Sequence, residues 1–157
     1  MSDEEQEDSQ PEPEPRLFTL SEAERTRKEV QPILLEAVHC QRKLSAVEKD
    51  LSAMSARIMM MGGLIVPYEK LAKLRLDQQH LAETVRQALE RIHATGCLVK
   101  DLDIGLLDFP AVIDNEDVYF CWKLGEDRIR FYHRQNEGFA GRKPLDPRIQ
   151  GPGEDIQ

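Results

Sequence analysis

Apolar residues recur at heptad spacing through the first half of the chain, and this periodicity predicts a long amphipathic helix. Ser21, with Glu24 three residues later, predicts a capping box at the start of this helix. Gly62-Gly63 predicts its end, and Pro32 is expected to kink or interrupt it. All ten expected seam positions are apolar, as in a coiled coil: Val30, Ile33, Ala37, Cys40, Leu44, Val47, Leu51, Met54, Ile58 and Met61.

A second helical pattern begins near Pro67 and ends before Gly96. The connection between the two helices is short, so they are expected to be antiparallel neighbours. Apolar residues on their opposite faces need cover from a second copy, as a four-helix homodimer, or from the rest of the chain. These opposite faces carry Leu35, Val38, Leu76 and Leu89. The second seam reads Leu71, Leu74, Gln78, Leu81, Val85, Ala88, Ile92 and Thr95.

After Gly96 the hydrophobic period changes to two, which predicts antiparallel strands over 106–113, 118–124 and 128–134. Gly125-Glu126 suits a type II′ turn between the last two strands. That register places Trp122, Phe120 and Phe131 on one apolar face as structural residues. It pairs Trp122 with Ile129, Phe120 with Phe131, and Val118 with His133.

The patterns together predict an α+β fold, a long antiparallel, coiled-coil-like helical hairpin followed by a small antiparallel β unit. We expect one domain over residues 17–146, with the hairpin at about 21–95, the β unit at about 97–135 and a loop over 136–146. Residues 1–16, with three prolines and no apolar residue after Met1, are expected to form a disordered acidic tail. Residues 147–157 are expected to be flexible.

Charge and cysteine content narrow the setting of the protein. The net charge is −8, and residues 1–16 carry seven acids and one Arg. The rest of the chain is therefore near neutral. Its net charge does not favour binding to nucleic acid. Three cysteines without a Cys-x-x-Cys pair favour a reducing compartment. With no signal-like start and no apolar run of the length that spans a membrane, we expect a cytoplasmic protein without membrane contact.

Several spaced motifs resemble the bacterial family called domain of unknown function 2203. They are Leu107-Asp108-Phe109-Pro110-Ala111, Cys121 to Glu126, Tyr132-His133, and Gly138 to Arg142 through Pro144-Leu145. The resemblance covers residues 17–146, with Lys123 where Arg is expected and Tyr132 where Trp is usual. It supports the fold outline and implies no activity, because the family has none established.

Three tempting sites are discounted. Glu36 with His39 and Glu90 with His93 form two Glu-x-x-His motifs at similar heights on the helices, but the heptad phase turns them away from the seam, so we expect no metal there. Cys121 and His133 project from opposite faces in the predicted register, which argues against a Cys–His enzyme. Asp108 and Glu126 could form a pair of carboxylates. Glu126 lies in a predicted turn, however, where acidic residues are common because they stabilise the turn itself. We therefore assign no catalytic residue and no cofactor.

The outward β face gathers aromatic and cationic side chains that could stack bases, pair phosphates or dock an acidic segment. Nearby acids dilute the positive field, which weighs against nucleic acid, and a solvated face with Tyr119–Tyr132 packing is the plainer interpretation. The expected members are Tyr119, Tyr132, Lys123, Arg128, Arg130 and Arg134, with Arg142 and Lys143 just beyond.

We interpret the chain as a non-enzymatic interaction or scaffold protein that dimerises through its hairpin and presents the β unit to a protein partner. The alternatives are a nucleic-acid-associated protein, and a small-ligand or enzymatic function in the β unit. If there is a binding site, we expect it around the β hairpin and the loop after it. The expected site residues are Cys121, Glu126, Arg130, His133, Gly138, Gly141 and Arg142; alternatively the segment from Gly138 is a structural strap in which Arg142 pairs with an acid.

Overall fold

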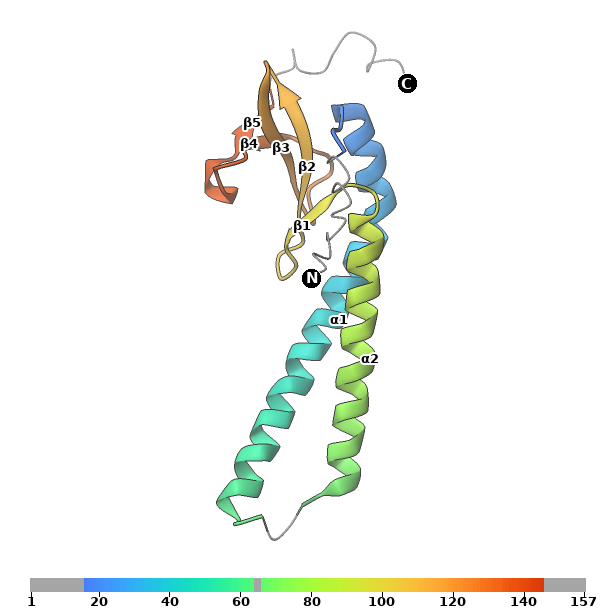
Figure 1. The fold of residues 1–157 in the computed structure, drawn as a ribbon, viewed down its shortest axis with the longest axis vertical. Coiled ribbons are helices and arrows are strands. Elements are labelled where there is room, and N and C mark those ends of the chain that lie inside the picture. Colours follow the sequence, from blue (N-terminus) through green and yellow to red (C-terminus); the bar gives the residue numbers. More distant parts are fainter. Residues whose placement is uncertain (1–15, 64–65, 146–157) are drawn as a thin grey trace, which may run out of the picture.

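Two long helices and a five-stranded antiparallel sheet make up residues 16–63 and 66–145, which the computed structural model describes. The sheet lies beside one end of the helical hairpin, and the other end projects well beyond it (Figure 1). The tail predicted over 1–16, apart from Arg16, and the flexible end predicted over 147–157 fall outside the described residues. The elements are α1 Leu20–Met60, α2 Tyr68–His93, β1 Leu98–Asp101, β2 Leu106–Ile113, β3 Glu116–Lys123, β4 Phe131–Arg134, a 3₁₀ turn Phe139–Gly141, and β5 Lys143–Pro144.

Helix α1 begins at a different cap from the predicted one. Thr19, in extended conformation, accepts a hydrogen bond from the Glu22 backbone N–H, whereas Ser21 and Glu24 already lie inside the helix. Glu24 instead accepts from the backbone N–H of Ile129, far along the chain. A kink or an interruption was predicted at Pro32. The helix is not interrupted there, but its axis changes direction between its blue and cyan parts in Figure 1.

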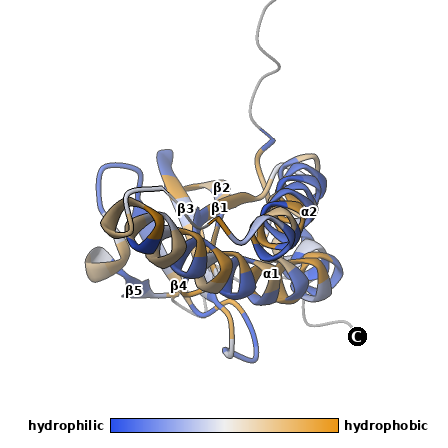
Figure 2. Ribbon diagram, turned by 90° about the horizontal axis from the view of Figure 1, so that it is seen from below, coloured by the Kyte–Doolittle hydropathy of each residue, from blue (hydrophilic) through white to orange (hydrophobic). Residues whose placement is uncertain are grey.

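The two helices pack along the predicted seam, and the helical hairpin is confirmed. Gly62 and Gly63, both at positive φ (66° and 76°), follow the end of α1. Viewed along the hairpin (Figure 2), the side of α2 that faces away from α1 is largely hydrophilic. Near the sheet the seam is buried at Ala37, Val85 and Ile92.

One face of the sheet packs against the first turns of α1 and the last turns of α2 and forms the core. Strand β2 occupies the predicted range, and it pairs Leu107 with Trp122 and Phe109 with Phe120 on this face. Strand β1 pairs only with the first residues of β2 and does not reach Pro110. The Pro110 carbonyl instead accepts a hydrogen bond from the Phe18 N–H at 2.7 Å. The core comprises Phe18, Leu20, Ala23, Val30, Leu34, Val38, Ile92, Cys97, Leu107, Phe109, Ala111, Val118, Phe120, Trp122 and Ile129.

The predicted register between β3 and β4 is wrong by one residue. The structure pairs Phe120 with Tyr132, Tyr119 with His133 and Cys121 with Phe131. Residues 124–130 form a longer connection in place of the two-residue Gly125-Glu126 turn. Trp122 and Phe120 keep their predicted burial, but Phe131 and His133 move to the other face of the sheet.

A helix that spans a membrane must be both long and apolar. Neither α1 nor α2 meets both conditions.

Candidate functional site

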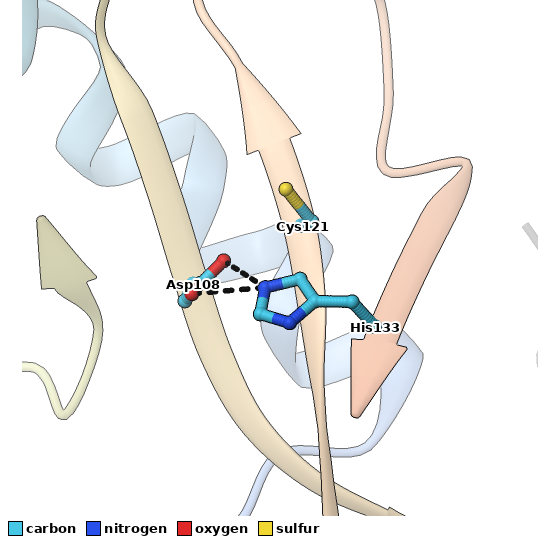
Figure 3. Close-up of side chains that lie close together, drawn as sticks. All are labelled: Asp108, Cys121 and His133. Atoms are coloured by element: carbon cyan, nitrogen blue, oxygen red, sulfur yellow. Dashed lines mark hydrogen bonds and ion pairs between the residues drawn. The ribbon is translucent and has the colours of Figure 1, made fainter. Parts of the chain in front are cut away.

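Three buried side chains with metal-binding or catalytic chemistry meet on the sheet face that points away from the helices. Asp108 on β2 lies directly opposite Cys121 on β3, and His133 extends toward them from β4 (Figure 3). Their ligand atoms all lie within 4.8 Å of one another, and each residue is at most 4% exposed. The expectation that Cys121 and His133 lie on opposite faces is therefore wrong, as a consequence of the one-residue register error.

The hydrogen bonds of His133 fix how its ring is used. Nδ1 lies 2.8 Å from the backbone carbonyl of Arg134, and because a carbonyl can only accept, Nδ1 carries a hydrogen. Nε2 lies 3.1 Å from both carboxylate oxygens of Asp108. Two lone pairs would repel each other at this distance, so Nε2 and the carboxyl group share a hydrogen.

Burial governs the chemistry of the two acidic members. It raises the pKa of the Asp108 carboxyl, an effect that the His133 contact partly opposes. Burial, followed by the nearby Asp108, raises the pKa of the Cys121 thiol to about 12. Both ring nitrogens of His133 are engaged elsewhere, and the thiol stays protonated at neutral pH. The cluster thus lacks the activated thiolate that a Cys–His nucleophile needs.

Arg142 closes the site on the β4–β5 side. Its guanidinium carbon lies 4.0 Å from the ring centroid of Phe131 and 4.7 Å from that of Phe139. Its Nη2 donates to Glu126 Oε1 at 2.6 Å, and Glu126 also accepts from the Lys123 N–H. Arg142 thus pairs with an acid, and its positive charge is balanced by Glu126, whereas Phe139 is 42% exposed and does not fill the core.

The other predicted site residues are not part of this cluster. Arg130 is half-exposed and pairs with Asp127 at 2.9 Å. Gly138 has open space around it, whereas a Cβ at Gly141 would meet the Glu137 carboxylate at 2.8 Å. Of the seven predicted residues, the structure brings together Cys121 and His133, with Glu126 and Arg142 close enough to influence the Cys121 thiol.

The predicted aromatic and cationic face does not form as one surface. Tyr132 turns toward the core side and packs against it, while Tyr119 lies beside His133, with ring centroids 5.4 Å apart. The predicted Tyr119–Tyr132 packing is therefore wrong. Four of the expected cations are paired with acids: Arg130 with Asp127, Arg134 with Glu116, Arg142 with Glu126 and Lys143 with Glu137.

The two Glu-x-x-His motifs are placed as the heptad phase predicted. Glu36, His39 and Glu90 are exposed on the helices. His93 Nε2 accepts from the Val99 backbone N–H at 3.3 Å, at the junction of α2 with the sheet. Their surroundings are helix surfaces and a helix end.

A second feature lies at the free end of the hairpin, where α1 and α2 diverge (Figure 1). A cleft of about 690 Å³ lies between them. Next to it, Met59 and Met60 are 81% and 88% exposed. The cleft is lined by Asp50, Ala53, Met54, Arg57, Ile58, Met61, Pro67, Lys70 and Leu74.

The comparisons with known proteins give a family and little else. The model of a family described as "Uncharacterized conserved protein (DUF2203)" matches residues 16–145. The chain is also 31% identical over 91 residues to the E3 ubiquitin-protein ligase TRIP12 of Danio rerio, a match that covers 46% of this chain and 4% of that protein. No solved structure matches this chain.

Proposed function

The chain belongs to the uncharacterized conserved protein family DUF2203, and from its geometry we propose that it is a non-enzymatic interaction protein that binds a second copy of itself through the free end of the hairpin. The observation that carries this proposal is the uneven burial of the helical seam. Near the sheet, α1 and α2 have a third layer to pack against. Beyond Leu44, Met54 is the one buried residue of α1, and α2 has no buried residue before Val85 in its described span.

Two helices cannot by themselves bury apolar side chains on more than one side. In the far half of the hairpin, the seam residues Leu71, Leu74 and Leu81 are only half-buried. Val85, which belongs to the same apolar seam nearer the sheet, is buried. Leu76 is 66% exposed. Two further helices at this end would complete a four-helix arrangement of the kind that the seam pattern favours.

A second copy is the occupant that the chemistry of this end favours. The cleft offers an apolar lining, and Met59 and Met60, at the same end of the same hairpin, offer flexible apolar side chains that can fill it. In a two-fold dimer, each copy supplies both the cleft and the methionines, so one patch satisfies itself. The rim carries Asp50 together with Arg57 and Lys70, which can pair across such an axis.

Replacing Met59 and Met60 with Gln together tests this proposal. Each fully buried Met contributes about 1.5–3 kcal/mol, so the double variant should weaken dimerisation by at least about a hundredfold. Light scattering during size-exclusion chromatography at micromolar concentration should give twice the 18.0 kDa chain mass for the parent and one chain mass for the variant.

Leu35→Gln is the matched control, because Leu35 is an exposed apolar residue of α1 (45%) outside the cleft. It should leave the dimer intact. A parent protein that is monomeric at these concentrations, or a Met59→Gln/Met60→Gln variant that dimerises as the parent does, would refute the proposal.

We propose separately that the protein works in a reducing compartment, the cytoplasm. Cys40, Cys97 and Cys121 are free thiols in the structure, and the latter two are buried without a disulfide.

A further inference from the structure

We propose that Asp108, Cys121 and His133 bind a divalent transition-metal ion, with Zn²⁺ the best match, on the face of the sheet opposite the helices. This inference is independent of the dimer. It starts from a cluster that the interaction function leaves unused: three neighbouring strands each direct one metal-ligating side chain to the same buried point (Figure 3).

The donor set selects the class of ion. A thiolate, an imidazole and a carboxylate together are typical of Zn²⁺ sites, whereas Mg²⁺ and Ca²⁺ are bound by oxygen ligands. Ligand atoms around a tetrahedral Zn²⁺ lie roughly 3.5 Å apart, given metal–ligand distances of about 2.0–2.3 Å. The Nε2–Oδ separation of 3.1 Å and the 4.8 Å limit for the whole cluster bracket that value. Small side-chain rotations therefore suffice to enclose an ion.

The second contact of His133 is the one that metal-binding histidines ordinarily make. Its Nδ1–H donates to the Arg134 carbonyl at 2.8 Å. Such an outer bond fixes the tautomer and the orientation of the ring, and it presents Nε2 as the ligand. Here Nε2 lies 3.1 Å from both oxygens of Asp108, so a metal ion held by Nε2 would also reach the carboxylate.

Charge balance also favours a divalent ion. When the ion displaces the proton shared by Asp108 and His133 and the proton of the Cys121 thiol, one carboxylate and one thiolate balance its two charges. The buried cluster then carries no net charge, so no isolated charge is left in a poorly solvated site. Arg142 does not upset this balance, because Glu126 neutralises it at 2.6 Å.

Three protein ligands leave one coordination position for water or another donor. The strap residues Arg142 and Phe139 lie on that side of the sheet, next to Phe131, which pairs with Cys121. Because the ligands are buried, we expect the ion to enter during folding or through opening of the strap.

The test uses the full chain, unfolded with chelator and refolded with or without Zn²⁺. Native mass spectrometry after dialysis should show one Zn²⁺ per chain, and the melting temperature should rise with Zn²⁺. Refolding with Co²⁺ as a spectroscopic probe should give the intense thiolate-to-metal charge-transfer absorption. The variants Cys121→Ser, Asp108→Asn and His133→Gln should each weaken Zn²⁺ binding by more than about tenfold.

Cys40→Ser and Asp127→Asn are the controls, since they remove a thiol and a carboxylate outside the cluster, and both should bind Zn²⁺ as the parent does. Circular dichroism verifies that each variant is folded. If a ligand variant fails to fold, the parent alone decides. A parent that takes up no Zn²⁺ and shows no charge-transfer band with Co²⁺ overturns the proposal, as does a folded Cys121→Ser variant that retains both.

Discussion

Asp108 and His133 share one proton at a place in the sheet that water scarcely reaches. A buried carboxylate without a partner would cost several kcal/mol, and the contact with His133 offsets part of that cost. Cys121 adds a neutral thiol beside them, because burial and the adjacent carboxyl both disfavour its thiolate. Without a metal ion, the three residues therefore form a satisfied but inert polar cluster.

This electrostatic setting predicts how the three cysteines react with iodoacetamide. The thiolate is the reactive form, and burial raises the pKa of the Cys121 thiol to about 12, so the residue stays a thiol at pH 8. Cys40, which is partly exposed, should be alkylated in the folded protein at pH 8, whereas Cys121 and buried Cys97 should react only after unfolding. Peptide mass spectrometry with and without denaturant measures this difference. Equal modification of Cys121 and Cys40 in the folded chain would contradict it.

The sequence contained one signal for this cluster that the prediction of the site did not use. Asp108 interrupts an otherwise apolar strand, Leu106 to Ile113, and a carboxylate inside such a strand needs a buried partner. Cys121 and His133 were expected at the site, but Asp108, which links them, was not. A correct register was required to bring the three together.

At the scale of elements, the β3–β4 connection shows how tertiary contacts override a local turn signal. Residues 124–130 are held by α1: Glu24 accepts from the Ile129 N–H, and Arg27 donates to the Asp127 carbonyl at 3.1 Å. Trp122 lies beneath this connection and donates from Nε1 to the Glu126 carbonyl. These contacts join distant parts of the chain, and they hold an irregular connection in place of a two-residue turn.

Trp122 should therefore be the anchor of the β unit. It is fully buried, with Arg27 above its ring at 5.6 Å. Trp122→Ala should cost about 3–5 kcal/mol and lower the melting temperature by roughly 10 °C or more. Thermal unfolding followed by circular dichroism measures the change. Tyr68→Ala, which removes an aromatic ring that is 74% exposed, is the control. A Trp122→Ala variant that melts within a degree or two of the parent would show that this residue does not anchor the sheet.

Elements with strong periodicity could be predicted from the sequence, and their connections could not. The heptads located both helices, and a short run of mostly apolar residues located β2. Aromatic residues stand at both 131 and 132, so an aromatic side chain faces the core in either of two registers that differ by one residue. The alternation of apolar and polar residues therefore could not fix the register of β4. The Asp114-Asn115 turn between β2 and β3, with φ of 50° and 63°, was a readable signal for a tight hairpin that the prediction did not use.

At the scale of the whole molecule, its two ends differ in how their apolar side chains are buried. The sheet end contains the core and the Asp108–Cys121–His133 cluster, whereas the free end of the hairpin has apolar side chains and a cleft but little core. Val38, expected to need cover, is buried near the sheet, while Leu35 and Leu76 stay exposed. In the proposed dimer the free ends meet, and both sheets point outward.

Small-angle X-ray scattering tests this arrangement most directly, because it measures the length of the particle. Helix α1 has 41 residues and is therefore about 60 Å long. Two copies joined at their free ends should extend to on the order of 100 Å or more, and the Met59→Gln/Met60→Gln variant should return to the length of one copy. A parent particle with the mass and length of a single chain, or a dimer no longer than one copy, would contradict the proposed joining of hairpin ends.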